Sequence, residues 1–198
     1  MPRGVRRTAC LLLLAGWVAA PATAADARPA WLAEAISLGS TKKKLDPYAA
    51  AGLAVTYTTP FLRVARAANK AFREGRTPRP ADIEAKAYAP ELRILVGALP
   101  VTASERLLGL AAPKSARLTL GPGEIKASRM EQAIAKQSVS VGRGAPTVVS
   151  GGLLKAVFEV PGTPPAHGEL EIRYVWTHDG REEEFLERVP LDFRKTRW

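Results

Sequence analysis

The chain has 198 residues, a formal net charge of +10 and a single cysteine, Cys10. Cys10 lies in an N-terminal segment that we expect to be removed, so the mature chain is predicted to lack disulfides, thiol nucleophiles and cysteine metal clusters. The remaining residues, about 174, are enough for a single folding unit with a substantial core.

The first 24 residues have the three parts of a secretory signal peptide. Arg3, Arg6 and Arg7 precede an apolar run over residues 9–20, and small residues follow up to Ala24. This run is much shorter than the roughly 20 residues that a membrane-spanning helix needs, and no later apolar segment is longer. The sequence therefore predicts export to the periplasm or the medium, cleavage near Ala24, and no transmembrane segment in the mature chain.

The positive charge is unevenly distributed along the mature chain. Removal of the three leader arginines leaves 26 of the 29 lysines and arginines against 19 acidic residues. Residues 25–99 carry 12 cations and 7 anions, whereas residues 100–198 carry 14 and 12. We expect any electrostatic partner to meet the first half of the chain.

Residues 25–52 are predicted to form an N-terminal helical and linker segment. A short apolar stretch from Trp31 to Ile36 indicates a helix, and the three lysines at 42–44 indicate a solvated linker. The β-branched and aromatic residues at 53–57 then predict the first strand of a β domain that extends over residues 53–198.

A helix is predicted over residues 60–75. Thr59 can accept the unpaired amide hydrogens of its first turn, Pro60 suits the first helical position, and Gly75 can end it. At about 100° per residue the helix has an apolar and a basic face. The apolar face contains Phe61, Val64, Ala65, Ala68, Ala71 and Phe72. The opposite face carries what we call the basic stripe, Arg63, Arg66, Lys70 and Arg73, with Arg76 just beyond.

A second short helix is predicted over residues 80–88, ended by Pro90. After it the apolar residues alternate with polar ones, which indicates strands that are buried on one face only. Turn residues such as Asp179-Gly180 separate the alternating runs. The predicted buried faces are Leu92, Ile94 and Val96; Leu118 and Leu120; Val139 and Val141; Leu154, Ala156, Phe158 and Val160; Leu170, Ile172, Tyr174 and Trp176; and Val189, Leu191 and Phe193.

These runs predict a mainly β fold, an antiparallel β-sandwich of about seven strands with an immunoglobulin-like arrangement and two or three short helices in its N-terminal part. The Cys-Trp-Cys core typical of immunoglobulin domains is missing, so this expectation concerns architecture alone. The segments 105–112 and 129–136 fit either a helical turn or an irregular strand, which leaves the topology between residues 100 and 136 open.

The residue types needed for covalent chemistry are sparse. His167 and His178 both lie in predicted turns, so a metal site would need ligands from elsewhere. Ser150 lacks the preceding glycine of a nucleophile elbow, and the glycines at 142–144 do not follow a βαβ unit. Three consecutive glutamates, 182–184, would point to opposite faces of a strand and are expected to keep a sheet edge soluble. The sequence therefore predicts no enzyme, metal or cofactor.

The basic stripe permits two interpretations. It could dock an anionic envelope component or an acidic protein, or it could be the solvent face of a helix whose alanine-rich side packs on the sandwich. Membrane insertion is disfavoured because that side is mainly alanine, with two phenylalanines and one valine. Nucleic-acid binding is disfavoured because aromatic residues do not interleave with the cations.

We accordingly expect an exported, non-enzymatic binding or accessory module of the bacterial envelope, with contact residues Arg63, Arg66, Lys70, Arg73 and Arg76. Two alternatives stay open. One is a structural subunit of an envelope assembly that recruits through an exposed sheet edge. The other is a hydrolase with a loop-built site around His178 and Asp179.

Overall fold

The computed structural model describes residues 28–41, 44–50 and 54–198. The predicted signal peptide with Cys10, and two of the three linker lysines, lie outside the described residues. The fold is mainly β, with 51% strand and 17% helix, in two antiparallel sheets of five strands each. Among the described residues, none of the helices combines the length and the apolar character that crossing a membrane requires.

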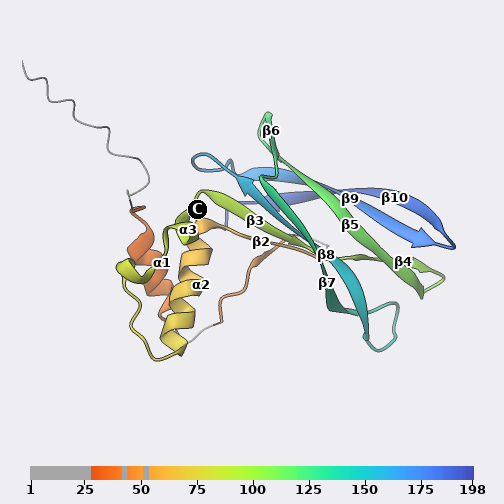
Figure 1. Cartoon of the computed structure of the whole chain (residues 1–198), viewed down its shortest axis with the longest axis horizontal. Helices are drawn as coiled ribbons and strands as arrows, with labels where there is room; N and C mark the ends of the chain where they lie inside the picture. Colours follow the sequence, from red (N-terminus) through yellow and green to blue (C-terminus); the bar gives the residue numbers. More distant parts are fainter. Residues whose placement is uncertain (1–27, 42–43, 51–53) are drawn as a thin grey trace, which may run out of the picture.

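The helices gather at one end of the molecule, beside the strands (Figure 1). They are α1 (Leu32–Gly39), α2 (Pro60–Arg73), the 3₁₀ turn η1 (Pro80–Asp82) and α3 (Ala85–Tyr88). The predicted helix over 80–88 is thus broken into η1 and α3, because Ile83 and Glu84 between them have extended backbone angles.

The first sheet has the order β1-β2-β3-β8-β7. Its strands are β1 (Tyr48–Ala49), β2 (Val55–Thr58), β3 (Glu91–Val96), β8 (Thr147–Glu159) and β7 (Arg129–Val139). The second sheet has the order β10-β9-β5-β4, with β6 also paired to β5. Its strands are β10 (Arg181–Asp192), β9 (His167–His178), β5 (Arg106–Leu120), β4 (Leu99–Ala103) and β6 (Gly123–Lys126).

The expected count of about seven strands was too low, since the described residues form ten. Three of the additional strands, β1, β4 and β6, have two to five residues, which is too short for an alternating pattern to be recognised. The two segments left open between helix and strand both belong to long strands, β5 and β7.

The alternation of apolar residues predicts the core well. Leu92, Leu118, Leu154, Leu170 and Val189 are all fully buried, and each comes from a different strand. These residues belong to a single buried cluster that draws on both sheets. The inward-facing positions of the two sheets therefore pack against each other.

The expectation that the alanine side of α2 packs on the sheets was wrong. Phe61, Val64 and Ala68 form a separate buried cluster with Leu32 and Ile36 of α1. Small side chains allow two helices to approach as closely as they allow a helix to approach a sheet, and the sequence pattern does not distinguish the two cases. Arg66, Lys70 and Arg73 of the basic stripe are therefore exposed on the outer side of a helix pair.

The predicted ends of α2 and the predicted hairpin are confirmed. The Leu62 amide donates to the hydroxyl of Thr59, Pro60 takes the first helical position, and Gly75 follows the helix with φ of 75°. Asp179 and Gly180 join β9 to β10 with φ of 49° and 74°, as a two-residue hairpin turn requires.

Candidate functional site

The basic stripe of α2 divides into one cation that holds the fold together and others that face solvent. Arg63 is half-buried. Its Nε donates to the carbonyl oxygen of Ala87 at 3.1 Å, and its two terminal nitrogens donate to those of Ala89 and Glu91 at 2.5 Å each. These bonds tie α2 to the end of α3 and the start of β3.

Burial lowers the pKa of Arg63 to about 10, and the neighbouring Arg93 contributes to this shift. The guanidinium still carries its charge at neutral pH. Because all of its nitrogens donate to the backbone, Arg63 is separated from the other predicted contact residues and serves the fold.

Arg66, Lys70 and Arg73 are exposed and border a hollow of about 460 Å³ beside Lys44. Within the described part of the chain these three stripe residues form no ion pair. Arg76 is exposed as well, but its guanidinium lies 2.5 Å from the carboxylate of Glu74. The outer face of α2 thus carries three cations that form no ion pair with a described residue.

Arg66 also borders a second hollow, which the sequence did not predict. This basic groove, of about 350 Å³, lies on the face of the first sheet that points away from the second sheet. Its floor consists of two rows of side chains that cross β2, β3, β8 and β7 in register. One row is Thr58, Arg93, Val157 and Arg129, and the other is Thr56, Leu95, Lys155 and Glu131.

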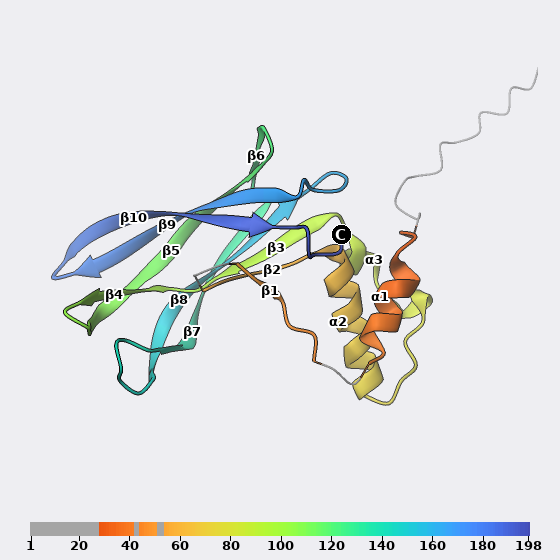
Figure 2. The same cartoon turned by 180° about the vertical axis from the view of Figure 1, so that it is seen from behind.

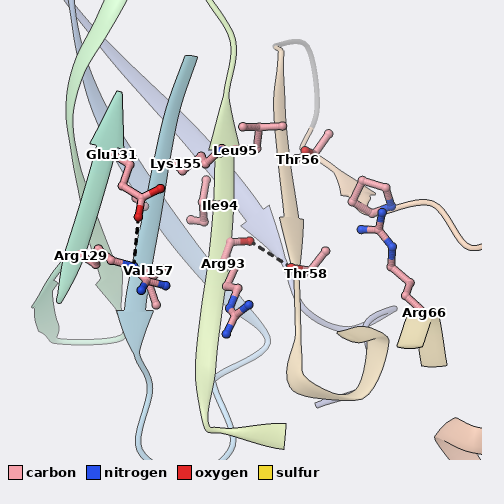
Figure 3. Close-up of a pocket in the computed structure, with 12 residues that line it drawn as sticks. Thr56, Thr58, Arg66, Arg93, Ile94, Leu95, Arg129, Glu131, Lys155 and Val157 are labelled. Carbon is pink, nitrogen blue, oxygen red and sulfur yellow. Dashed lines mark hydrogen bonds and ion pairs between the residues drawn. The ribbon is translucent and has the colours of Figure 1, made fainter. Parts of the chain in front are cut away.

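The groove is strongly cationic, because four cations and one carboxylate line it. Arg93 lies 2.9 Å from Glu91, and Arg129 lies 3.7 Å from Glu131. By contrast, Arg66 and Lys155 form no ion pair with any described residue. Figure 3 shows Arg66 extending from α2 on the β2 side, with Arg93 in the middle and the Arg129–Glu131 pair on the far side.

The groove can therefore hold an anion by charge while it contacts an apolar part of the same ligand. Leu95 is 38% exposed, and Val157, in the adjacent row of the floor, is 7% exposed. Guanidinium groups favour carboxylate, sulfate and phosphate because their donors match pairs of oxygen atoms. Thr56 and Thr58 add hydroxyl groups on the same side.

Sequence reasoning found Arg66 but missed Arg93, Arg129 and Lys155. Each of these three lies at an outward-facing position of a strand, which the alternation could have indicated. Their meeting depends on which strands are neighbours and in which register, and neither can be read from the local pattern. The excess of positive charge in the N-terminal half of the chain indicated only the side of the groove that Arg66 forms.

The two histidines lie far from each other and from the groove. His167 begins β9 and His178 ends it, eleven residues later, so about 36 Å of strand separates them. His178 stacks on Trp176 at 5.0 Å between ring centroids, and its Nε2 lies 3.1 Å from Asp179 at the exposed hairpin turn. The described residues contain no group of three or more histidine or acidic side chains that could hold a metal.

The geometry thus combines a cationic helix face with a cationic sheet groove, joined at Arg66. Comparison with protein-family models, with curated proteins and with solved structures finds no match to this chain.

Proposed function

We propose that this protein is an exported, non-enzymatic binding module of the bacterial envelope that holds an anionic partner in its basic groove. The observation that carries the proposal is the meeting of four cations, from one helix and three strands, over the apolar side chains of Leu95 and Val157. The partner is an anionic polymer or an acidic protein segment. Export is supported by the N-terminal sequence pattern.

The scaffold of this module is an immunoglobulin-like β-sandwich. The buried cluster that draws on both sheets supports this architecture. Such a scaffold holds outward-facing side chains at fixed spacings, because neighbouring strands lie about 4.8 Å apart. A rigid sheet therefore presents the groove cations at little entropic cost on binding.

Retention on immobilised heparin, a sulfated polysaccharide, tests this function. Three variants each change the net charge by the same amount. The groove variant carries Arg129→Glu and Lys155→Glu, and the stripe variant carries Lys70→Glu and Arg73→Glu. The control variant carries Lys126→Glu and Arg143→Glu, at exposed positions outside both hollows.

We expect the groove variant to elute at the lowest salt concentration and the control variant closest to wild type, because local charge and not total charge determines binding. Equal elution of the groove and control variants would remove the groove from the proposal. Selective loss in the stripe variant alone would move the contact to the outer face of α2.

A second candidate function is a structural subunit of an envelope assembly. It is favoured by apolar side chains on the outermost strands of the two sheets. Ile134 on β7 is 83% exposed and Leu186 on β10 is 52% exposed, and an exposed apolar edge strand is a typical pairing site. Purification from the native envelope would return a stable partner in this case, whereas the protein alone would argue against it.

A further inference from the structure

The two sheets carry surfaces of opposite charge. We call the distal part of the β9–β10 hairpin, residues 177–186, the acidic arm. It contains four carboxylates, Asp179 and the three glutamates 182–184, and one arginine, Arg181. The basic groove has the reverse composition, four cations and one carboxylate. The arm and the groove are therefore opposite in the sign of their net charge.

The acidic arm exposes an apolar side chain on each face. Phe185 and Leu186 are consecutive residues of β10, so their side chains point to opposite faces of the hairpin. Phe185 is 38% exposed and Leu186 is 52% exposed, although both are large and apolar. Figures 1 and 2 show the tip of this hairpin at the end of the molecule opposite the helices.

The arm of a molecule cannot reach its own groove. The groove lies on the face of the first sheet that points away from the second sheet, while the arm belongs to the second sheet. The first sheet therefore stands between the two surfaces. Any contact between them has to join different copies of the chain.

We propose that the acidic arm of one copy docks into the basic groove of another copy. This inference rests on the proposed function, since it identifies the anionic partner of the groove as a second molecule of the same protein. Carboxylates of the arm pair with Arg66, Arg129 and Lys155, while an apolar side chain of the arm covers Leu95 on the groove floor. Because the two surfaces differ, the contact is head-to-tail and builds an open chain or a ring.

The test is a charge exchange followed by sedimentation velocity of the purified full chain. The groove variant Arg129→Glu/Lys155→Glu makes the groove acidic, and the arm variant Glu182→Lys/Glu184→Lys, at two positions on the same face of β10, makes the arm basic. All four residues are exposed, so each variant is expected to fold, and the melting temperature verifies this. Lys126→Glu/Arg143→Glu is the control with the same charge change as the groove variant.

Wild type and control are expected to self-associate with rising protein concentration, and more at about 0.1 M than at about 1 M salt, where the Debye length falls from about 10 Å to about 3 Å. Each reversed variant alone should associate at least about tenfold more weakly, since attraction becomes repulsion at two sites. An equimolar mixture of the two should regain association, because an acidic groove then meets a basic arm.

The outcomes separate this proposal from the proposed function. A wild type that stays monomeric at about 0.1 M salt, yet binds heparin through the groove, overturns self-docking and leaves anion binding in place. Association that persists in both reversed variants, or a mixture that fails to regain it, overturns the contact between arm and groove. If the groove and control variants elute from heparin at the same salt concentration while the mixture regains association, self-docking stands and only the binding of other anionic partners in the groove is overturned.

Discussion

Helix α1 approaches α2 so closely at Gly39 that a methyl group on this residue would lie 2.2 Å from the carbonyl oxygen of Ala65. The same methyl group would lie 2.7 Å from the Cβ atom of Ala68. Both distances are far below van der Waals contact, and the obstacles are backbone and a short side chain that cannot rotate away. The contact between the two helices therefore depends on the absence of a side chain at residue 39.

The change Gly39→Ala is accordingly expected to lower the free energy of unfolding by about 1–3 kcal/mol, because the helices must separate to admit the methyl group. Equilibrium urea unfolding measures this loss. Gly144→Ala is the matched control, since a methyl group there meets only ordinary contact at 3.5 Å, and a change within about 0.5 kcal/mol is expected. Equal stability of the two variants would contradict the close approach.

Arg63 and Arg66 are three positions apart on α2 but have opposite roles. Arg63→Ala removes one hydrogen-bond donor from each of three carbonyl groups and is expected to cost about 1.5–3 kcal/mol of unfolding free energy. Arg66→Ala should leave stability within about 0.5 kcal/mol of wild type, because the side chain is exposed, and should reduce heparin retention. A stable Arg63→Ala variant with weakened heparin binding would assign Arg63 to the binding surface instead.

The sequence predicts which side chains of each long strand are buried, but it does not predict the order of the strands in the sheets. Leu154, Ala156 and Phe158 are buried together because alternation records which face of a strand meets the core. Arg93 and Arg129 come together only because both flank Val157 of β8, at sequence distances of 64 and 28 residues. Local patterns carry no information on such long-range register, so three of the four groove cations were missed.

The hairpin between β4 and β5 was missed for a different physical reason. Its turn residues, Ser104 and Glu105, have φ of 47° and 61°, although neither is glycine, asparagine or aspartate. Side chains with a Cβ atom are disfavoured in this region of backbone space. The usual mark of a two-residue turn was therefore absent, in contrast to Asp179-Gly180, where it was present and correctly interpreted.

Replacement of Ser104-Glu105 by Asn-Gly is therefore expected to stabilise the protein. Both new residues tolerate positive φ, and relief of the strain outweighs the greater flexibility of glycine in the unfolded chain by about 0.5–1 kcal/mol. Thermal unfolding of the double variant Ser104→Asn/Glu105→Gly should show a higher melting temperature. Gly180→Ala, which forces a Cβ atom onto a φ of 74°, should show a lower one.

Tyr174 is fully buried in the core, and no described residue provides a hydrogen-bond partner for its hydroxyl group. A buried hydroxyl without a partner costs free energy, so Tyr174→Phe is expected to raise the unfolding free energy by up to about 1 kcal/mol. Tyr57→Phe is the opposite case, because the Tyr57 hydroxyl donates to the carbonyl oxygen of Asp192 at 2.8 Å. That variant should lose about 0.5–1.5 kcal/mol.

Ionisation of Tyr57 is also expected to lower the stability of the fold at alkaline pH. Burial, together with the nearby Asp192 carboxylate, raises the pKa of Tyr57 to about 12. A tyrosine in the unfolded chain has a pKa near 10, so the folded state holds the proton of the Tyr57 hydroxyl group more tightly. The resulting stability is fully present below pH 10 and is lost as the pH rises towards 12. Urea midpoints measured between about pH 8 and 11 should therefore fall more steeply in wild type than in Tyr57→Phe, and parallel slopes would show that the Tyr57 hydroxyl ionises as readily in the folded protein as in the unfolded chain.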